Sequence, residues 1–188
     1  MGLGPQIDAL GPDTQLVTLT GGGNDMGYVG DLTALGFGNR RGVVGWLVSL
    51  RWKGAKPVSE RDFAGLEANL TALFREIHRR APQARIVVAT YPAILPEAGT
   101  CEKLGLSEAQ AEIMRPVADK LAEVTRTAAA QAEAIVVDMA TLSAGHDACS
   151  TEPWTNGIKP DKGAPFHPTL AGARATALAI AEALGAGD

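Results

Sequence analysis

Long apolar runs are missing from this sequence: no stretch reaches the roughly eighteen residues that a membrane-spanning helix needs. The opening residues, Met1 to Pro5, lack a basic stretch followed by an apolar one, so we expect no signal peptide within the chain. Long blocks of one charge are missing too, with 17 basic against 21 acidic residues. This balance argues against an extended phosphate-binding surface, and therefore against nucleic acid as a partner.

Internal repeats and low-complexity tracts are also absent. What remains is 188 residues, of which 46% are apolar and 20% are charged. That is enough for one domain with a hydrophobic core and too little for two. We therefore expect a single domain over residues 1–188.

Three short segments are rich in β-branched residues and almost continuously apolar: residues 15–20, 85–90 and 134–139. Such segments are typical of strands that are buried on both faces of a parallel sheet. Between and after these segments, apolar residues recur at the spacing of amphipathic helices. The alternation predicts right-handed crossovers and a three-layer α/β/α domain with a parallel sheet.

The helices expected between these strands have recognisable beginnings and ends. One is predicted to start at a capping Ser59 and to run to about Arg80. The next begins with a capping box of Ser107 and Gln110, and Pro116 is expected to kink or restart it. A last helix is predicted from about residue 169 to residue 184.

The end of the first predicted strand is the most informative feature. Residues 15–20 stop abruptly at three glycines, 21–23, which Asn24 and Asp25 follow. Open α/β sheets bind ligands beyond the carboxyl ends of their strands, so this junction places bare backbone and a side-chain amide where a ligand is expected. Taken alone, the same residues are also typical of a turn that only ends a strand.

The block Gly22-Gly23-Asn24-Asp25, together with His167 ahead of an alanine-rich helical segment, resembles the SGNH (GDSL-type) hydrolases, in particular their secreted lipase and esterase branch. The resemblance implies a flavodoxin-like fold and hydrolysis of small-molecule or lipid carboxylic esters without a cofactor. It also implies that the Asn24 amide and the backbone at Gly22 and Gly23 stabilise the oxyanion of the reaction. His167 would be the general base.

The surroundings of the histidines depart from the family pattern in one respect. Family members often carry Asp three residues before the catalytic histidine, whereas this chain has Ala164 there. The main-chain carbonyl of Ala164 or of Pro165 is therefore expected to orient the ring of His167. His146 lies in a Gly-His-x-x-Cys context that the family uses structurally, so we interpret it as a supporting loop residue.

The Gly-Asp-Ser block that supplies the family's nucleophile is absent from the sequence. Five serines are present, and none lies in such a block: Ser49, Ser59, Ser107, Ser143 and Ser150. The resemblance therefore predicts that the chain corresponds to the later part of the family domain, with the N-terminal strands missing. Strand 15–20 would then expose an edge, which favours a homodimer through that strand or the binding of a peptide strand.

Cysteine is scarce, and Cys101 and Cys149 both lie in loop-like sequence. From the residues alone, two unrelated thiols are an open alternative. The resemblance implies instead that the two cysteines form a disulfide. Since disulfides persist in oxidising compartments, a secreted or extracytoplasmic location is expected.

Two other functions compete with ester hydrolysis. A non-catalytic relative could keep the pocket or the surface for binding or assembly. A metal-dependent phosphoesterase could use five residues as ligands, although no His-x-His or Asp-x-His pair supports it: Asn24, Asp25, Asp138, His146 and His167.

The glycine-rich segment 26–58 shows neither the hydrophobic period of a helix nor that of a strand. It is interpreted either as a helical turn that only packs against the domain or as a wall that binds the acyl chain.

Overall fold

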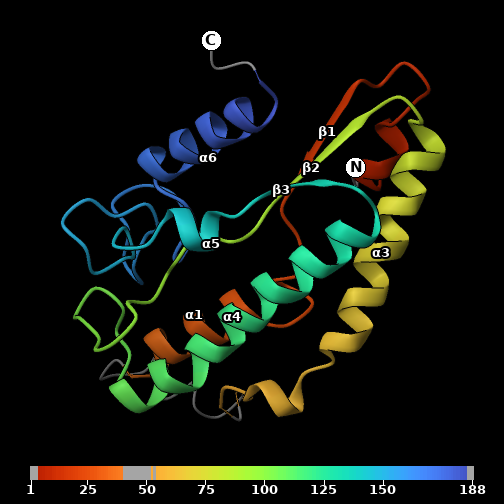
Figure 1. Ribbon diagram of the computed structural model, residues 1–188. Helices are drawn as coiled ribbons and strands as arrows, with labels where there is room; N and C mark the ends of the chain where they lie inside the picture. Colours follow the sequence, from red (N-terminus) through yellow and green to blue (C-terminus); the bar gives the residue numbers. More distant parts are fainter. Residues whose placement is uncertain (1–3, 40–51, 53, 186–188) are drawn as a thin grey trace.

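The computed structural model of the chain describes residues 4–39, 52 and 54–185. Figure 1 shows a small sheet with helices on both of its faces. In chain order the elements are η1 (Gln6–Ala9), β1 (Leu16–Leu19), α1 (Tyr28–Gly38), η2 (Val58–Glu60), α3 (Phe63–Arg80), β2 (Arg85–Ala89), α4 (Glu108–Gln131), β3 (Ile135–Val137), α5 (Met139–Leu142) and α6 (Leu170–Ala183).

The three predicted strands are confirmed and form one parallel sheet in the order β1-β2-β3. The expected burial on both faces holds for β2 but is wrong for β1, whose four residues are alternately exposed and half-buried. In its register Val17 is opposite Ile86, and Val88 is opposite Val136. The central strand β2 is buried from Ile86 to Ala89, which explains why its sequence is continuously apolar rather than alternating.

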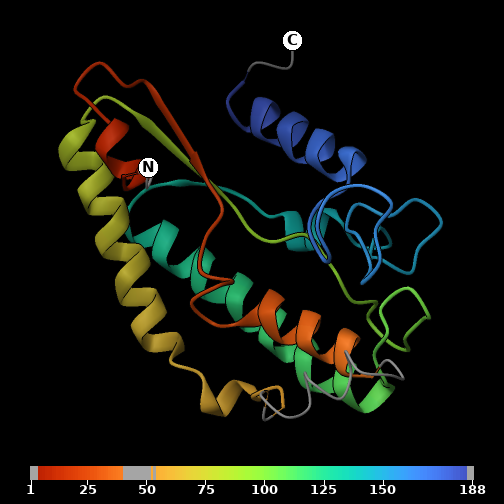
Figure 2. The same cartoon turned by 180° about the vertical axis from the view of Figure 1, so that it is seen from behind.

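Alternate residues of β2 face two different cores. Ile86 and Val88 belong to a large cluster with residues of α1, α3 and α4. Val87 and Ala89 belong to a smaller cluster with Val137 and Met139, against which α6 packs. Both views show α1, α3 and α4 on one side of the sheet and α6 on the other (Figures 1 and 2). The three-layer arrangement therefore follows from the period of two along a single strand.

The start of α3 differs from the expectation. Ser59 lies in the short helix η2 and does not cap α3, because the backbone is extended at Arg61 before the helix begins. The cap is Asp62, whose side chain accepts a hydrogen bond from the Gly65 backbone at 2.8 Å. An aspartate beside the first helical residue satisfies the free N–H groups that Ser59, three residues earlier, cannot reach.

The capping box of α4 is confirmed, since Ser107 and Gln110 each accept a hydrogen bond from the backbone of the other. The helix continues through Pro116 to Gln131 and does not restart there. Burial of one face of α4 along its length compensates for the hydrogen bond that proline cannot donate. No helix in the described part of the chain is long and apolar enough to cross a membrane.

The two cysteines form a disulfide, as the resemblance implied. Cys101 lies in the loop after β2 and Cys149 in the loop after α5, with their Cα atoms 5.8 Å apart. The bond joins positions separated by 48 residues. It therefore ties together the two loops that follow neighbouring strands.

Replacing Cys101 and Cys149 together by serine is expected to lower the free energy of unfolding by about 4 kcal/mol, because the bridge restricts a long loop in the unfolded chain. Denaturant unfolding measures the change. The double variant should not respond to reductant, which makes it the control. Two free thiols in the unreduced, denatured chain would contradict the pairing.

Candidate active site

In the turn after β1, Gly22 and Gly23 cannot be replaced by a larger residue without rearrangement of their neighbours. Gly22 has φ +89°, and a Cβ there would lie 3.0 Å from Leu66 Cδ1. A Cβ at Gly23 would lie 2.7 Å from Cζ of Tyr91. Both glycines are buried, and the carbonyl of Gly23 accepts a hydrogen bond from the Tyr28 backbone at 2.8 Å. The turn is therefore wedged between the core and the Tyr91 ring.

Asn24 and Asp25, the next residues of this turn, are exposed. Among the described residues, the side chain of Asn24 makes no hydrogen bond, so its amide is available to a ligand. Burial raises the pKa of the neighbouring Tyr91, against the opposing effect of a hydrogen bond with the Gly23 backbone. The Tyr91 phenol thus stays neutral beside the turn.

Arg61 is bonded to the turn after β1, a role that no pattern in the sequence predicted. Its side chain is 3% exposed, donates to the carbonyl of Met26 and forms an ion pair with Asp31 at 2.6 Å. The indole of Trp52 donates to the same aspartate at 3.1 Å. A buried, ion-paired guanidinium of this kind adds little net stability, because its desolvation offsets the attraction to the carboxylate.

His167 lies in the loop before α6, and a main-chain carbonyl orients its ring. Its Nδ1 lies 2.8 Å from the carbonyl oxygen of Pro165, whereas the carbonyl of Ala164 accepts from the side chain of Asn156. Of the two carbonyls expected from the sequence, Pro165 is therefore the one used. A carbonyl only accepts, so Nδ1 carries the proton and Nε2 is left as the acceptor.

The His167 loop has its own anchors. The preceding residue, Phe166, is 2% exposed and has φ +58°, which turns the chain so that the neighbouring histidine is exposed. Thr169 caps α6 through the Gly172 backbone at 3.1 Å. Gly172 itself packs against the backbone of Trp154 so closely that a Cβ would lie 2.1 Å from its carbonyl oxygen. These contacts position His167 without any side-chain carboxylate.

His146 occupies a structural position, in agreement with its interpretation as a supporting residue. Its ring stacks on Trp154 with centroids 4.2 Å apart and an angle of 7° between the planes. Its Nδ1 lies 2.9 Å from the carbonyl of Glu152. The stacked pair therefore holds the loop between α5 and α6 together.

Four of the five serines lie in the described part of the chain, and three of them have local structural contacts. Ser107 caps α4, and Ser150 donates to the carbonyl of Asp147. Ser143 is completely buried, accepts from the Ala93 backbone at 2.7 Å and donates to the carbonyl of Met139. Ser59 lies in η2, and Ser49 is outside the described residues. None of the four is placed as an activated nucleophile.

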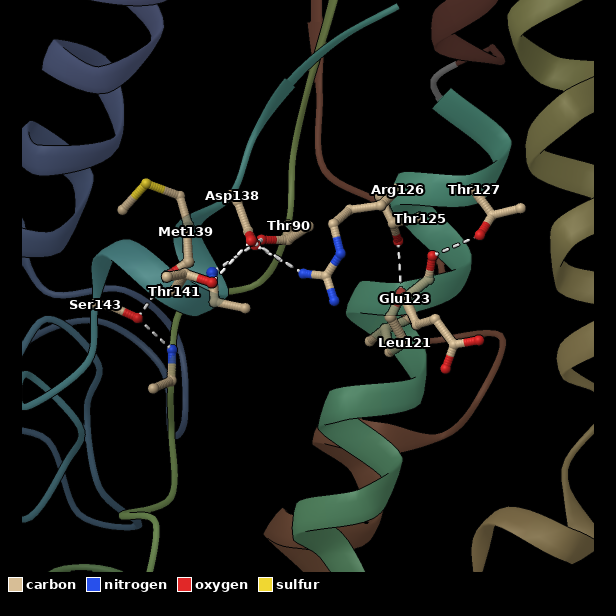
Figure 3. Close-up of polar contacts among 12 residues, drawn as sticks. Thr90, Leu121, Glu123, Thr125, Arg126, Thr127, Asp138, Met139, Thr141 and Ser143 are labelled. Atoms are coloured by element: carbon tan, nitrogen blue, oxygen red, sulfur yellow. Dashed lines mark hydrogen bonds and ion pairs between the residues drawn. The ribbon is translucent and has the colours of Figure 1, made fainter. Parts of the chain in front are cut away.

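Asp138, at the carboxyl end of β3, is the centre of a polar network (Figure 3). It accepts from Thr90 and Thr141 at 3.0 and 2.8 Å, and it pairs with Arg126 at 3.0 Å. Burial by itself raises the pKa of Asp138, but the hydrogen bonds from the two threonines and the charge of Arg126 outweigh burial and lower it. The carboxylate therefore joins β2, β3 and α4.

The residues considered as metal ligands are not brought together. Within the described ranges, no three His, Cys, Asp or Glu side chains are arranged to hold a metal ion. The interpretation as a metal-dependent phosphoesterase has no ligand cluster in this part of the chain.

Asn24 and His167 both lie at the carboxyl edge of the sheet. Asn24 follows β1 directly, and the loop that carries His167 is tied to the segment after β2 by Thr155, whose hydroxyl donates to the carbonyl of Ala93 at 2.8 Å. Among the described residues, no hydrogen bond joins Asn24 to His167.

Residues 28–38 of the glycine-rich segment form the packed helix α1, while residues 40–51, with most of the expected acyl wall, lie outside the described residues.

Comparison of the sequence with known proteins identifies relatives. The profile of the GDSL-like lipase/acylhydrolase family matches residues 2–175. Lipase 2 of Streptomyces coelicolor (strain ATCC BAA-471 / A3(2) / M145) is 35% identical over 197 residues, which cover 98% of this chain and 64% of the relative. A lipase of Streptomyces rimosus is 32% identical over 170 residues, which cover 90% of this chain and 60% of the relative. The chain thus spans less than two thirds of either lipase.

Two solved structures share the fold. The crystal structure of an extracellular lipase from Streptomyces rimosus superposes with a TM-score of 0.68 at 27% identity, over 97% of this chain and 73% of that one. That of phospholipase A1 from Streptomyces albidoflavus NA297 gives 0.67 at 24% identity, with the same coverage. These likenesses confirm the expected three-layer α/β/α fold.

Replacing Gly23 by alanine is expected to destabilise the protein by about 1–3 kcal/mol, because the new methyl group overlaps the Tyr91 ring. Gly21→Ala is the matched control, since a Cβ at Gly21 meets nothing within 4 Å. Thermal unfolding of the two variants measures the difference. Equal stability of both would show that Tyr91 moves freely and does not support the turn.

Proposed function

This chain belongs to the GDSL-like lipase/acylhydrolase family, and we propose that it carries the oxyanion-binding and general-base residues of a carboxylic ester hydrolase. The single observation that carries the proposal is the pairing of His167 with the Pro165 carbonyl, which leaves Nε2 as an acceptor. A ring held in this tautomer accepts a proton from a nucleophile without help from a carboxylate.

Asn24 supplies the electrophilic half of the proposed site. Its unpaired amide and the nearby backbone of Gly22 and Gly23 offer donors for the oxyanion that forms when an ester carbonyl is attacked. The Tyr91 ring and Arg61 both contact the turn, so its backbone donors are positioned before substrate binds. Preorganised donors of this kind stabilise the transition state more than mobile ones.

The substrate class we propose is a small-molecule or lipid ester, supported by the names of the relatives, two of which are lipases. A secreted or extracytoplasmic location is proposed on two grounds. The protein contains a disulfide, which needs an oxidising compartment to form. In addition, the similar Streptomyces rimosus structure is that of an extracellular lipase.

A non-catalytic binding or assembly protein is the second candidate, and one observation favours it. The sequence contains no Gly-Asp-Ser block, and the described serines that make side-chain hydrogen bonds use them for local structure. A protein of this kind would keep the turn and the histidine loop but would bind esters without hydrolysing them.

We further propose that the chain associates through the edge of β1. Among the described residues, no strand pairs with the outer side of β1. The Gln15 carbonyl accepts from the Arg85 backbone, so alternation points the N–H and C=O groups of Leu16 and Thr18 away from β2. Leu16 is also 44% exposed. A second copy, or an extended peptide, satisfies such an edge.

The 188-residue chain is expected to hydrolyse p-nitrophenyl butyrate weakly, with an acceleration of at most about 10³–10⁴ over the uncatalysed reaction, since donors and base act without a serine nucleophile. His167→Ala and Asn24→Ala should each remove this residual rate. His78→Ala, on the exposed surface of α3, is the control and should leave it unchanged.

Two results would contradict this expectation. Fast turnover that a fluorophosphonate abolishes would identify a functional serine among the five in the chain. A residual rate that is the same in His167→Ala as in the unchanged chain would remove the histidine from the reaction and favour the non-catalytic candidate.

Thr18→Pro is expected to convert a dimer into a monomer, because it removes an outward-pointing N–H donor and leaves the ladder with β2 intact. Thr18→Val keeps the donor and should associate like the unchanged chain. Sedimentation velocity at micromolar concentration measures the oligomeric state, with thermal unfolding to show that each variant is folded. Persistence of the dimer in Thr18→Pro would place the contact elsewhere.

A further inference from the structure

A cavity of about 400 Å³ lies between α4 and the segments that follow β2 and β3. Its walls come from residues 91–97, from residues 115–122 of α4, from residues 140–147 and from Tyr28. Neither Asn24 nor His167 lines it. The cavity is therefore distinct from the proposed hydrolase site, and Tyr28 and Tyr91, which both contact Gly23, lie between the two.

Small side chains leave this space open. Two alanines of α4 face two alanines that follow β3: Ala118, Ala122, Ala140 and Ala144. Ile94 and Leu95 complete the apolar part of the wall and are both buried. The volume falls in the range of small-molecule sites, and the apolar walls suit a short aliphatic chain.

The charged residues of the lining are mainly acidic. Asp147 is 9% exposed, and only one of its oxygens has a partner, the Cys149 backbone at 2.8 Å. Asp119 is exposed on α4 and has no ion pair or hydrogen bond in the part of the chain that the structure describes. Glu97 adds a third carboxylate at the exposed rim.

Arg115 is the one cation among the lining residues, and its charge is already offset. Its guanidinium forms an ion pair with Glu108 at 3.0 Å and donates to the carbonyls of Pro96 and Gly99. The remaining charge of the lining is therefore negative, which disfavours an anionic ligand.

Tyr28 gives independent evidence that the cavity accepts a polar ligand. This residue is only 1% exposed, and its hydroxyl makes no hydrogen bond within the described residues. In the described part of the chain no completely buried side-chain oxygen or nitrogen lacks a partner, so the unpaired Tyr28 hydroxyl is not sealed in the core but open to the cavity that Tyr28 lines. Burial, and secondly the charge of Asp119, raise the pKa of Tyr28.

We propose that this cavity binds a small primary ammonium ion with a short aliphatic chain. The ammonium group donates charge-assisted hydrogen bonds to Asp119 and Asp147 and a third to the Tyr28 hydroxyl oxygen. The aliphatic chain packs against the alanines of α4 and of the segment after β3. The negative charges of Asp119 and Asp147 would repel an anion, and a neutral polyol would gain no ionic attraction from them.

The test is calorimetric titration of the 188-residue protein with three probes of similar size: butylammonium chloride, sodium butyrate and glycerol. Saturable binding is expected for butylammonium alone. Asp119→Asn and Tyr28→Phe should each weaken it roughly tenfold, since each removes one polar contact. Asp13→Asn, which removes the same charge from an exposed turn before β1, is the matched control and should bind like the unchanged protein.

Ala118→Leu provides a second test that does not depend on charge, because the larger side chain fills the cavity and should abolish binding while the protein stays folded by circular dichroism. Equal binding of glycerol or butyrate would overturn the proposal. So would the absence of saturable binding by butylammonium, or an unchanged affinity in both Asp119→Asn and Ala118→Leu. None of these results depends on esterase activity.

Discussion

The burial of β2 between two apolar clusters is the constraint on which the rest of the molecule depends. Because the strand is fixed on both faces, the residues just beyond its carboxyl end are fixed as well. Thr90 bonds to Asp138 after β3, Tyr91 packs against Gly23 after β1, and Ala93 is bonded to Ser143 and Thr155. The loops of the proposed site are thus held in place by contacts with the residues that follow one rigid strand.

The proposed hydrolase site uses backbone where related chemistry often uses side chains. A carbonyl rather than a carboxylate orients His167, and a glycine turn presents Asn24. Both depend on tight contacts: Phe166 in the left-handed region beside the histidine, and the Tyr91 ring beside the turn. Backbone elements in a packed core have few alternative positions, so they hold donors and acceptors in place before a substrate arrives.

The strands were predictable because all three segments are short, apolar at nearly every position and rich in β-branched residues, a combination typical of parallel sheets. The capping box at Ser107 was predictable because both partners lie three residues apart. The start of α3 was not, since Ser59 and Asp62 are equally good caps in sequence. Only the extended backbone at Arg61 decides between them.

By itself the sequence determined the parallel three-layer architecture, the glycine turn with Asn24 and the family resemblance, because these depend on local periodicity and on residues adjacent in the chain. The tertiary structure alone decided which carbonyl orients His167, that Arg61 holds the turn, and that Tyr28 and Asp119 share a cavity. These are contacts between residues on different elements. Their partners follow from how the helices pack around β2, and no short pattern in the chain records that packing.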